Sequence, residues 1–346
     1  MYTNHMDKVK INLGYLSYEK LSYDAETFGF FHDDGSMNLN AFLNVVIANM
    51  YDFRKDNLTQ RRNFLQGRLS NRYNHVQIDQ LVSSLSSFDS LSRHISEESK
   101  DVYVSIRPNK ETQLLFETIA LTECKETSFS SYLFSLLEEY LHLDQSEREI
   151  IANKKEYELV NKAIEDNLFI AFTNGIDRKV ILRPFLFGSN RDNSFNYVYG
   201  VLGEQGKELC SVHLFKLRNN LVLIDKHFSF TKDEKDYMNK NLITQGIQFI
   251  GSSFIKATVE LDKLGLKRLK KIYYNRPLIE SITPNEKTGG GTVVLAGSEY
   301  QIQSYLYRLE DHAFVLNPLS MSQKLCESHR LAYLEYSKKL AKQIKK

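Results

Sequence analysis

Polar and apolar residues alternate in two short segments of the chain, residues 8–13 and 102–107. The polar positions are Lys8, Lys10 and Asn12 in the first segment and Tyr103, Ser105 and Arg107 in the second. An alternation of period two predicts β-strands that point these side chains to one outer face. Lys, Arg and Asn on such a face can pair with phosphates and read base edges of nucleic acid. Charge on an exposed edge strand also prevents aggregation, so the residue types leave both interpretations open.

Each alternating segment is followed by a copy of a helical pattern. Residues 40–51 and 130–141 align without a gap, at an offset of 90 residues. The equivalent apolar positions are Phe42/Tyr132, Leu43/Leu133, Val46/Leu136, Ile47/Leu137, Met50/Tyr140 and Tyr51/Leu141. The pattern therefore predicts two copies of one unit, each made of a strand, a helix, a polar break and a second helix. Residues suited to capping the second helices lie at 36–38 and 127–128.

This order resembles a ribbon-helix-helix unit, which works as a pair whose antiparallel strands enter the DNA major groove. Residues 67–100, with an amphipathic stretch from His75 to Leu91, are long enough to let the two units pair within one chain. Pairing with a second chain is the alternative. Two unlike ribbons lack the symmetry of a palindromic operator, which argues against an ordinary operator-binding repressor.

Composition indicates a globular protein without metal or cofactor. The 346 residues are 42% hydrophobic and 25% charged, with a net charge of +2. No apolar run is long enough to span a bilayer and no signal-peptide pattern begins the chain, so we expect a cytoplasmic location without membrane contact. The three cysteines, Cys124, Cys210 and Cys326, lack ligand spacing. No catalytic motif is present, so we expect a non-enzymatic protein.

Because the net charge is small, any nucleic-acid surface must be a local patch. Basic residues cluster at three places: after the first repeat, in residues 267–271 and in the C-terminal tail. The first cluster comprises Arg54, Lys55, Arg61, Arg62, Arg68 and Arg72. Each cluster alone is more often a solvated face, and several together favour nucleic-acid binding.

Five short strands are predicted in the middle of the chain, after a helix over 146–167. They cover residues 167–172, 180–187, 195–200, 211–217 and 221–224 and are separated by Gly, Asn and Asp turns. Strands at this spacing predict a small barrel. Their order, with Arg183-Pro184 in the second strand, Asn196-Tyr197-Val198 in the third and the basic segment from His213 to Asn219, resembles a WYL domain. That domain is an Sm-like or SH3-like β-barrel.

The resemblance implies a contact surface for RNA or a nucleotide. Its candidate residues are Arg183, Tyr197, His213, Phe215, Lys216 and Arg218. A cation beside an aromatic ring offers a phosphate partner and a stacking face together. His213 and Asn219 stand where the family usually has Arg, which weakens the anion-binding groove on that strand face.

Residues 309–318, followed by a helix from Ser320, resemble the C-terminal extension of WYL regulators. In those proteins the extension commonly forms dimers, which implies a homodimer here. The resulting expectation is an α+β chain with ribbon-helix-helix units in residues 1–145, a WYL barrel in 146–235 and an α/β extension in 245–346.

The arrangement resembles the WYL accessory proteins of type VI-D CRISPR systems, which bind single-stranded RNA and stimulate an RNA-targeting effector. The resemblance implies RNA binding by the WYL domain and modulation of a type VI-D effector. The alternative is a WYL-type, ligand-sensing transcription regulator that binds duplex DNA through the ribbon. A third class is a structural dimer that assembles other proteins.

Overall fold

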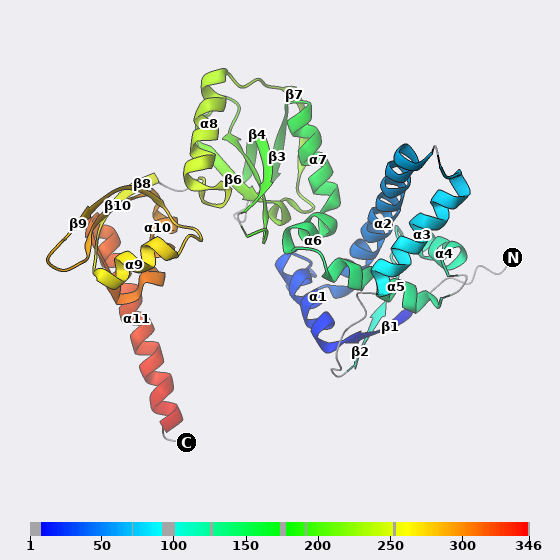
Figure 1. The fold of residues 1–346 in the computed structure, drawn as a ribbon, viewed down its shortest axis with the longest axis horizontal. Helices are drawn as coiled ribbons and strands as arrows, with labels where there is room; N and C mark the ends of the chain where they lie inside the picture. Colours follow the sequence, from blue (N-terminus) through cyan, green and yellow to red (C-terminus); the bar gives the residue numbers. More distant parts are fainter. Residues whose placement is uncertain are drawn as a thin grey trace. The chain divides into compact units, whose positions relative to one another are not determined.

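The computed structural model describes residues 8–70, 72–91, 101–124, 127–173, 178–190, 192–251 and 254–344. This part contains helices and three antiparallel sheets, which confirms the predicted α+β composition (Figure 1). The chain divides into two compact units. Unit 1 comprises Met1–Leu159, Asn193–Asn196 and Leu214–Leu221, and unit 2 comprises Val160–Asp192, Tyr197–His213 and Val222–Lys346. The three-domain division stays a prediction, and Lys345 and Lys346 of the basic tail lie outside the described residues.

Unit 1 begins with the predicted strand and two helices, present twice. The first copy is β1 (Val9–Gly14), α1 (Tyr15–Thr27) and α2 (Leu39–Leu69); the second is β2 (Asp101–Ile106), α4 (Gln113–Thr122) and α5 (Phe129–Leu141). A further helix, α3 (His75–Leu91), follows α2. The expected side-chain caps are present, since Asn38 Oδ1 accepts the Ala41 amide at 2.9 Å and Ser128 Oγ accepts the Ser131 amide at 3.1 Å.

The repeated apolar positions form the core of unit 1. Every member of the six aligned pairs is buried except Tyr132, which is half-buried. The Phe42 ring meets the Phe30 ring at 5.0 Å and the Tyr140 ring at 6.0 Å, both edge to face. Aromatic pairs prefer an edge-to-face arrangement to a face-to-face sandwich. Helices from both copies share this one core.

Strands β1 and β2 pair with each other in antiparallel register, so the ribbon forms within one chain. Ile11 lies opposite Val104, and both side chains belong to the core. Of the two pairings that the sequence left open, the structure has the one within the chain.

The helix predicted over 146–167 is two helices, α6 (Gln145–Ala152) and α7 (Lys154–Glu165). The break falls at Asn153, whose backbone has φ −123° and ψ 38°. Asn153 Nδ2 donates to the Glu149 carbonyl at 3.0 Å. Asn side chains compete with the helix for such backbone groups, which explains the break.

The first sheet of unit 2 has five strands in the order β6-β5-β4-β3-β7. They are β3 (Leu168–Thr173), β4 (Lys179–Ser189), β5 (Asn196–Leu202), β6 (Leu209–His213) and β7 (Val222–His227). All five were predicted, but in the described residues β6 and β7 do not pair, so the sheet is open and the expected closed barrel is not formed.

The fourth predicted strand ends early, at His213. Residues Leu214–Leu217 form a 3₁₀ helix, η1, instead of continuing the strand. Leu214 and Leu217 are both buried, and residues three apart share a face in a 3₁₀ turn but not in a strand. The burial of this pair therefore favours the turn. Helix α8 (Lys232–Gln245) was not predicted, although Thr231 and Glu234 form a capping box at its start.

The C-terminal part of unit 2 has the element order strand, helix, strand, strand, helix, strand. Its elements are β8 (Phe254–Leu261), α9 (Lys263–Lys271), β9 (Leu278–Pro284), β10 (Gly291–Ser298), α10 (Glu299–Leu306), the 3₁₀ helix η3 (Tyr307–His312), β11 (Ala313–Asn317) and α11 (Leu319–Ile344). The sheet order is β11-β8-β10-β9, a ferredoxin-like topology. Across the described residues, no helix is both long enough and apolar enough to cross a bilayer.

We predict that Glu310→Gly stabilises this C-terminal part. Glu310 has φ 58° and ψ −131°, a conformation that costs a residue other than glycine about 1–3 kcal/mol. Its exposed ion pair with Arg268 offsets little of that cost. The control is Glu310→Ala, which loses the same ion pair and keeps the Cβ. In urea denaturation the glycine variant should exceed the alanine variant by about 1 kcal/mol; equal stability would contradict the strain.

Candidate nucleic-acid interface

The outer face of the β1–β2 ribbon carries the six side chains predicted to form the DNA-reading ribbon. Lys10 lies opposite Ser105 and Asn12 opposite Tyr103, while Ile11 and Leu13 point into the core. Lys8 and Arg107, next to the paired segments, are exposed as well. Tyr103 is the most accessible aromatic residue of the ribbon, with 71% of its surface exposed. Segments some ninety residues apart in sequence thus form one polar surface.

Beside this face lies a groove of about 730 Å³. Its lining combines ribbon residues with the start of α2: Lys8, His32, Met37, Asn38, Leu39, Asn40, Ala41, Ser105, Arg107 and Asn109. None of these residues is acidic. The first amides of a helix lack intrahelical acceptors, and they carry a partial positive charge that favours anions. The lining of the groove is therefore neutral to positive.

The backbone of Arg107 is fixed by two asparagines of α2. Asn40 Oδ1 accepts the Arg107 amide at 2.8 Å, and Asn44 Nδ2 donates to the Arg107 carbonyl at 3.0 Å. The buried Asn44 side chain is satisfied further, because its Oδ1 accepts from the Asn109 amide at 3.2 Å and from the Thr112 hydroxyl. These bonds dock the end of β2 on the start of α2, which fixes one wall of the groove.

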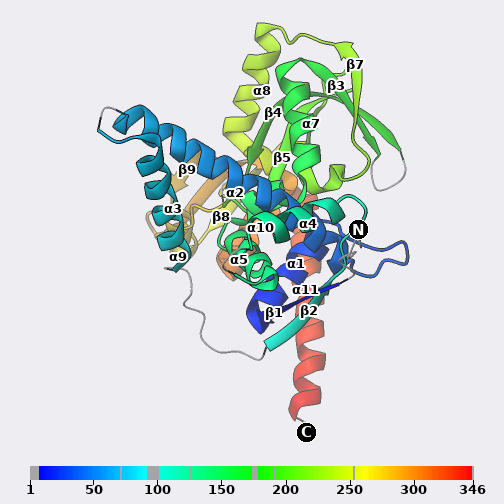
Figure 2. The same cartoon turned by 90° about the vertical axis from the view of Figure 1, so that its right-hand side faces the viewer.

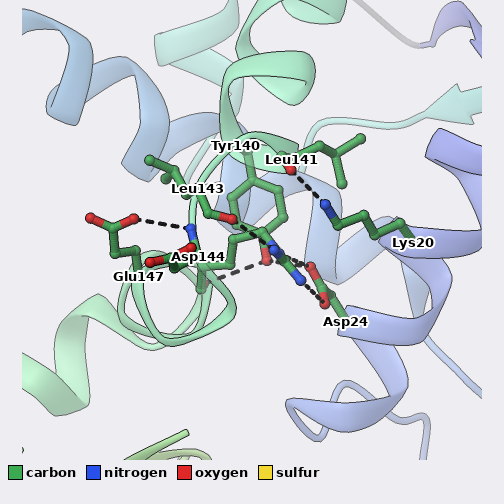
Figure 3. Close-up of polar contacts among 8 residues, drawn as sticks. Lys20, Asp24, Tyr140, Leu141, Leu143, Asp144 and Glu147 are labelled. Atoms are coloured by element: carbon green, nitrogen blue, oxygen red, sulfur yellow. Dashed lines mark hydrogen bonds and ion pairs between the residues drawn. The ribbon is translucent and has the colours of Figure 1, made fainter. Parts of the chain in front are cut away.

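A buried ion pair joins the first copy to the segment after the second (Figure 3). Arg148 of α6 donates through Nε to Asp24 Oδ2 at 2.7 Å and through Nη2 to Asp24 Oδ1 at 3.2 Å. The Tyr140 hydroxyl also donates to Asp24 Oδ2, at 3.0 Å, and burial raises its pKa well above the ordinary value. Lys20 Nζ caps the Leu141 carbonyl at 2.6 Å. The ion pair of Asp24 with Arg148 is structural, because both side chains are buried.

Glu149 of α6 is a fully buried carboxylate that binds Asn196, where β5 begins, and Phe215 of η1. Its Oε2 accepts from the Asn196 amide at 2.6 Å and from Asn196 Nδ2 at 2.9 Å, and its Oε1 accepts from the Phe215 amide at 3.2 Å. Burial raises the pKa of this carboxyl to about 7, although the three hydrogen bonds oppose the shift. An acid of this pKa is partly protonated at neutral pH.

We predict that Glu149 makes the protein less stable as pH rises from about 4.5 to about 7. The folded-state pKa lies above the unfolded value, so the folded state binds the extra proton and its stabilising effect is lost as pH rises through the folded pKa. Between pH 5 and 8 the loss amounts to about 2 kcal/mol. Urea denaturation of wild type and Glu149→Gln at both pH values isolates this contribution. Parallel pH dependences in the two proteins would refute it.

Three residues of the WYL-type contact set lie in unit 2. Arg183 of β4 is buried, with 6% of its surface exposed, and its Nη1 lies 3.3 Å from Glu234 Oε1. Its Nη2 donates to the Gly206 carbonyl at 2.8 Å. The guanidinium also lies over the Phe230 ring. Tyr197 is buried and lies opposite His213, with ring centroids 4.3 Å apart. These groups contact one another or the sheet, and Arg183 is engaged inside the unit.

The other three, Phe215, Lys216 and Arg218, belong to unit 1. Phe215 packs against the core of that unit. Arg218 donates to the Ala152 carbonyl at 3.1 Å and lies 3.4 Å from the centroid of the Phe30 ring, and burial lowers its pKa. Lys216 is exposed, the only one of the six that is. The set is therefore distributed over two units, with its arginines bound internally.

We predict that Arg183→Ala changes stability and not RNA affinity. The variant loses a buried hydrogen bond to a carbonyl and a cation–π contact, which together cost about 2 kcal/mol. Thermal unfolding and RNA binding should be measured on the same preparations. Glu234→Gln is the matched control, because it breaks the same ion pair from the other side. A loss of affinity in Arg183→Ala with unchanged stability would instead support the contact role implied by the family.

One group of potential metal ligands occurs in the described residues. Glu310, Asp311 and His312 bring one ligand atom each within 4.8 Å of one another. Glu310 is paired with Arg268, and His312 Nδ1 with Asp262 at 2.8 Å. These ion pairs account for the cluster without an ion.

The sequence did not identify the residues that position the interface. Asn40 and Asn44 are one helical turn apart and would have been recognisable as one face of α2, but their partner Arg107 is more than sixty residues away. Arg148 and Glu149 were unremarkable charges at the start of a helix. The helical pattern does not mark Glu149, because its neighbours three and four residues away include Gln145, Ser146 and Asn153.

No protein-family model matches the chain, and no curated protein matches its sequence. A solved structure does match: a CRISPR Cas-related protein shares 16% identity at a TM-score of 0.70, over 96% of this chain and 95% of that one. At this identity the likeness shows a common fold along nearly the whole chain. Proteasome accessory factor B/C (PafBC) of Arthrobacter aurescens matches at 14% identity over 67% of this chain and 37% of that one, but its TM-score of 0.29 supports no argument.

Proposed function

We propose that this chain is a non-enzymatic, nucleic-acid-binding accessory protein of a CRISPR system. The observation that carries the proposal is the β1–β2 ribbon, whose outer face collects Lys8, Lys10, Asn12 and Arg107 beside a groove without acidic residues. The two strand-helix-helix copies act as a ribbon-helix-helix pair contained in one chain. The fold shared with a CRISPR Cas-related protein supports this biological setting.

Single-stranded RNA is the proposed ligand. The two strands of the ribbon present unlike faces, Lys10 and Asn12 on β1 against Ser105 and Tyr103 on β2. A palindromic duplex requires equal half-sites, which this surface does not offer. The exposed Tyr103 ring suits an unpaired base, because single-stranded RNA is bound by stacking bases on aromatic side chains. Lys8, Lys10 and Arg107 supply the phosphate contacts.

The five-stranded sheet is proposed as a WYL-type module and the last hundred residues as its extension. We assign most of the RNA contacts to the ribbon and not to this module, since Arg183 and Arg218 are bound to partners within the protein. Lys216 keeps a family-type role at the surface. A type VI-D effector as the protein partner and a homodimer as the assembly stay predictions from the family resemblance.

The alternative, a duplex-DNA-binding regulator, uses the same ribbon residues. It differs in ligand, because strands in a major groove read base edges through Lys and Asn. Lys10 and Asn12 have the required residue types and exposure. Comparing single-stranded RNA with duplex DNA therefore separates the two functions.

We predict that Lys10→Ala and Arg107→Ala each weaken binding of single-stranded RNA severalfold. Each removes one phosphate contact, so the slope of log affinity against log salt should fall by about 0.7. Fluorescence anisotropy with a labelled 20-nucleotide RNA, titrated with salt, measures both effects. Lys287→Ala, an exposed lysine in a loop of unit 2, is the charge-matched control. A strong preference for duplex DNA would reject the RNA assignment in favour of the regulator.

A further inference from the structure

Helix α2 continues far beyond the repeated unit. The alignment of the two copies ends at Tyr51 and Leu141; α5 also ends at Leu141, whereas α2 runs on to Leu69. Burial of α2 side chains stops at the same place, since Tyr51 is the last fully buried residue of the helix. The extension, residues 52–69, adds about 27 Å of helix that the core of unit 1 does not require.

Helix α3 folds back along this extension to form a helical hairpin (Figure 2). Ile78 and Val82 of α3 are buried, and Leu58, Leu65 and Leu69 of α2 are half-buried. The hairpin is also held by Arg62 Nε, which lies 2.6 Å from Asp79 Oδ1, and by a contact of 3.1 Å between Gln66 Nε2 and His75 Nδ1. It is an ordered element with its own apolar contacts.

The α2 arm of the hairpin is strongly basic. Residues 54–72 contain six Arg or Lys and one acidic residue, Asp56, which gives +5 against +2 for the whole protein. Residues 57–69 contain no acidic residue and are rich in Asn, Gln and Arg. Such a local surplus of positive charge attracts a polyanion.

The charge is arranged as a stripe on one face of α2. Intervals of three and four residues separate its members, which are Arg54, Asn57, Arg61, Phe64 and Arg68. Arg54 is bound to Glu139 at the base of the stripe. Further along, the side chains of Arg61, Phe64 and Arg68 have large exposed surfaces. Phe64 has 62% of its surface exposed, and the Arg68 guanidinium lies 5.5 Å from the centre of its ring. An exposed aromatic ring beside a guanidinium is a stacking face next to a phosphate partner.

We propose that the α2–α3 hairpin binds single-stranded nucleic acid, with Phe64 stacked on an unpaired base and Arg61 and Arg68 on the adjoining phosphates. The inference rests on the proposed function and extends it with a contact surface separate from the ribbon groove. An unpaired base with its phosphates occurs in both RNA and DNA, so the experiment includes both strands.

The test uses the full chain and fluorescein-labelled 20-mers of uridylate and thymidylate, with a blunt RNA duplex for comparison. Phe64→Ala should weaken binding of the single strands about tenfold, the effect of losing one base–aromatic stack, and leave duplex binding unchanged. Arg68→Ala should reduce the salt slope by about 0.7. Arg68→Lys should retain that slope, because it keeps the charge. If the hairpin variants lose affinity for only the uridylate or only the thymidylate 20-mer, that nucleic acid is the ligand of the hairpin.

Two controls accompany these variants. Thr59→Ala lies on the opposite face of α2, and Lys287→Ala removes one charge from unit 2; neither should change affinity by more than about twofold. Circular dichroism and thermal unfolding check that the hairpin variants keep the fold, as expected for exposed side chains.

The outcomes separate this inference from the proposed function. If Phe64→Ala and Arg68→Ala bind like Thr59→Ala while the ribbon variants bind weakly, the hairpin surface is overturned and the function stands. If the hairpin variants bind weakly while the ribbon variants do not, the hairpin stands and the ribbon assignment fails. If the wild-type chain binds no single strand at moderate salt, both are overturned.

Discussion

The pairing of β1 with β2 within one chain is the constraint on which the candidate interface depends. In this register Ile11 and Val104 face the core together, and a shift by one residue would turn them to solvent. The same register places Lys10 beside Ser105 on the outside. The hydrophobic core therefore specifies the polar surface, although no polar residue of that surface takes part in the core.

A second set of interactions keeps the ribbon attached to its helices. Asn40 and Asn44 bind both backbone groups of Arg107, and the buried pair of Asp24 with Arg148 links α1 to α6. Removing two charges from water is costly, and such a pair persists only when each polar group has partners. Here Tyr140 and the Leu143 carbonyl supply the additional hydrogen bonds. The wall of the groove at Arg107 is thus held on α2 by its hydrogen bonds to Asn40 and Asn44.

Local periodicity predicted most of the strands and helices, because alternation and helical spacing are properties of neighbouring residues. It also predicted the outward residues of the ribbon. It failed at Asn153, where a side chain competes for the backbone of its own helix, and at Leu214 and Leu217, whose burial converts a strand end to a 3₁₀ turn. The family pattern marked Arg183 and Arg218 as cations but could not reveal Glu234 or the Ala152 carbonyl as their partners. Such partners are brought close only by the complete fold.

The two copies of the strand-helix-helix unit share one core but differ in everything outside it. The first copy contributes Lys10, Asn12 and the long basic helix; the second contributes Ser105, Tyr103 and a helix of 13 residues. A symmetric pair would present equal surfaces to the two halves of a duplex. Unequal surfaces give the protein a direction, and a single strand, which runs from 5′ to 3′, is a ligand with a direction of its own. The unequal surfaces of the ribbon, which fit a palindromic duplex poorly, are therefore suited to a single strand.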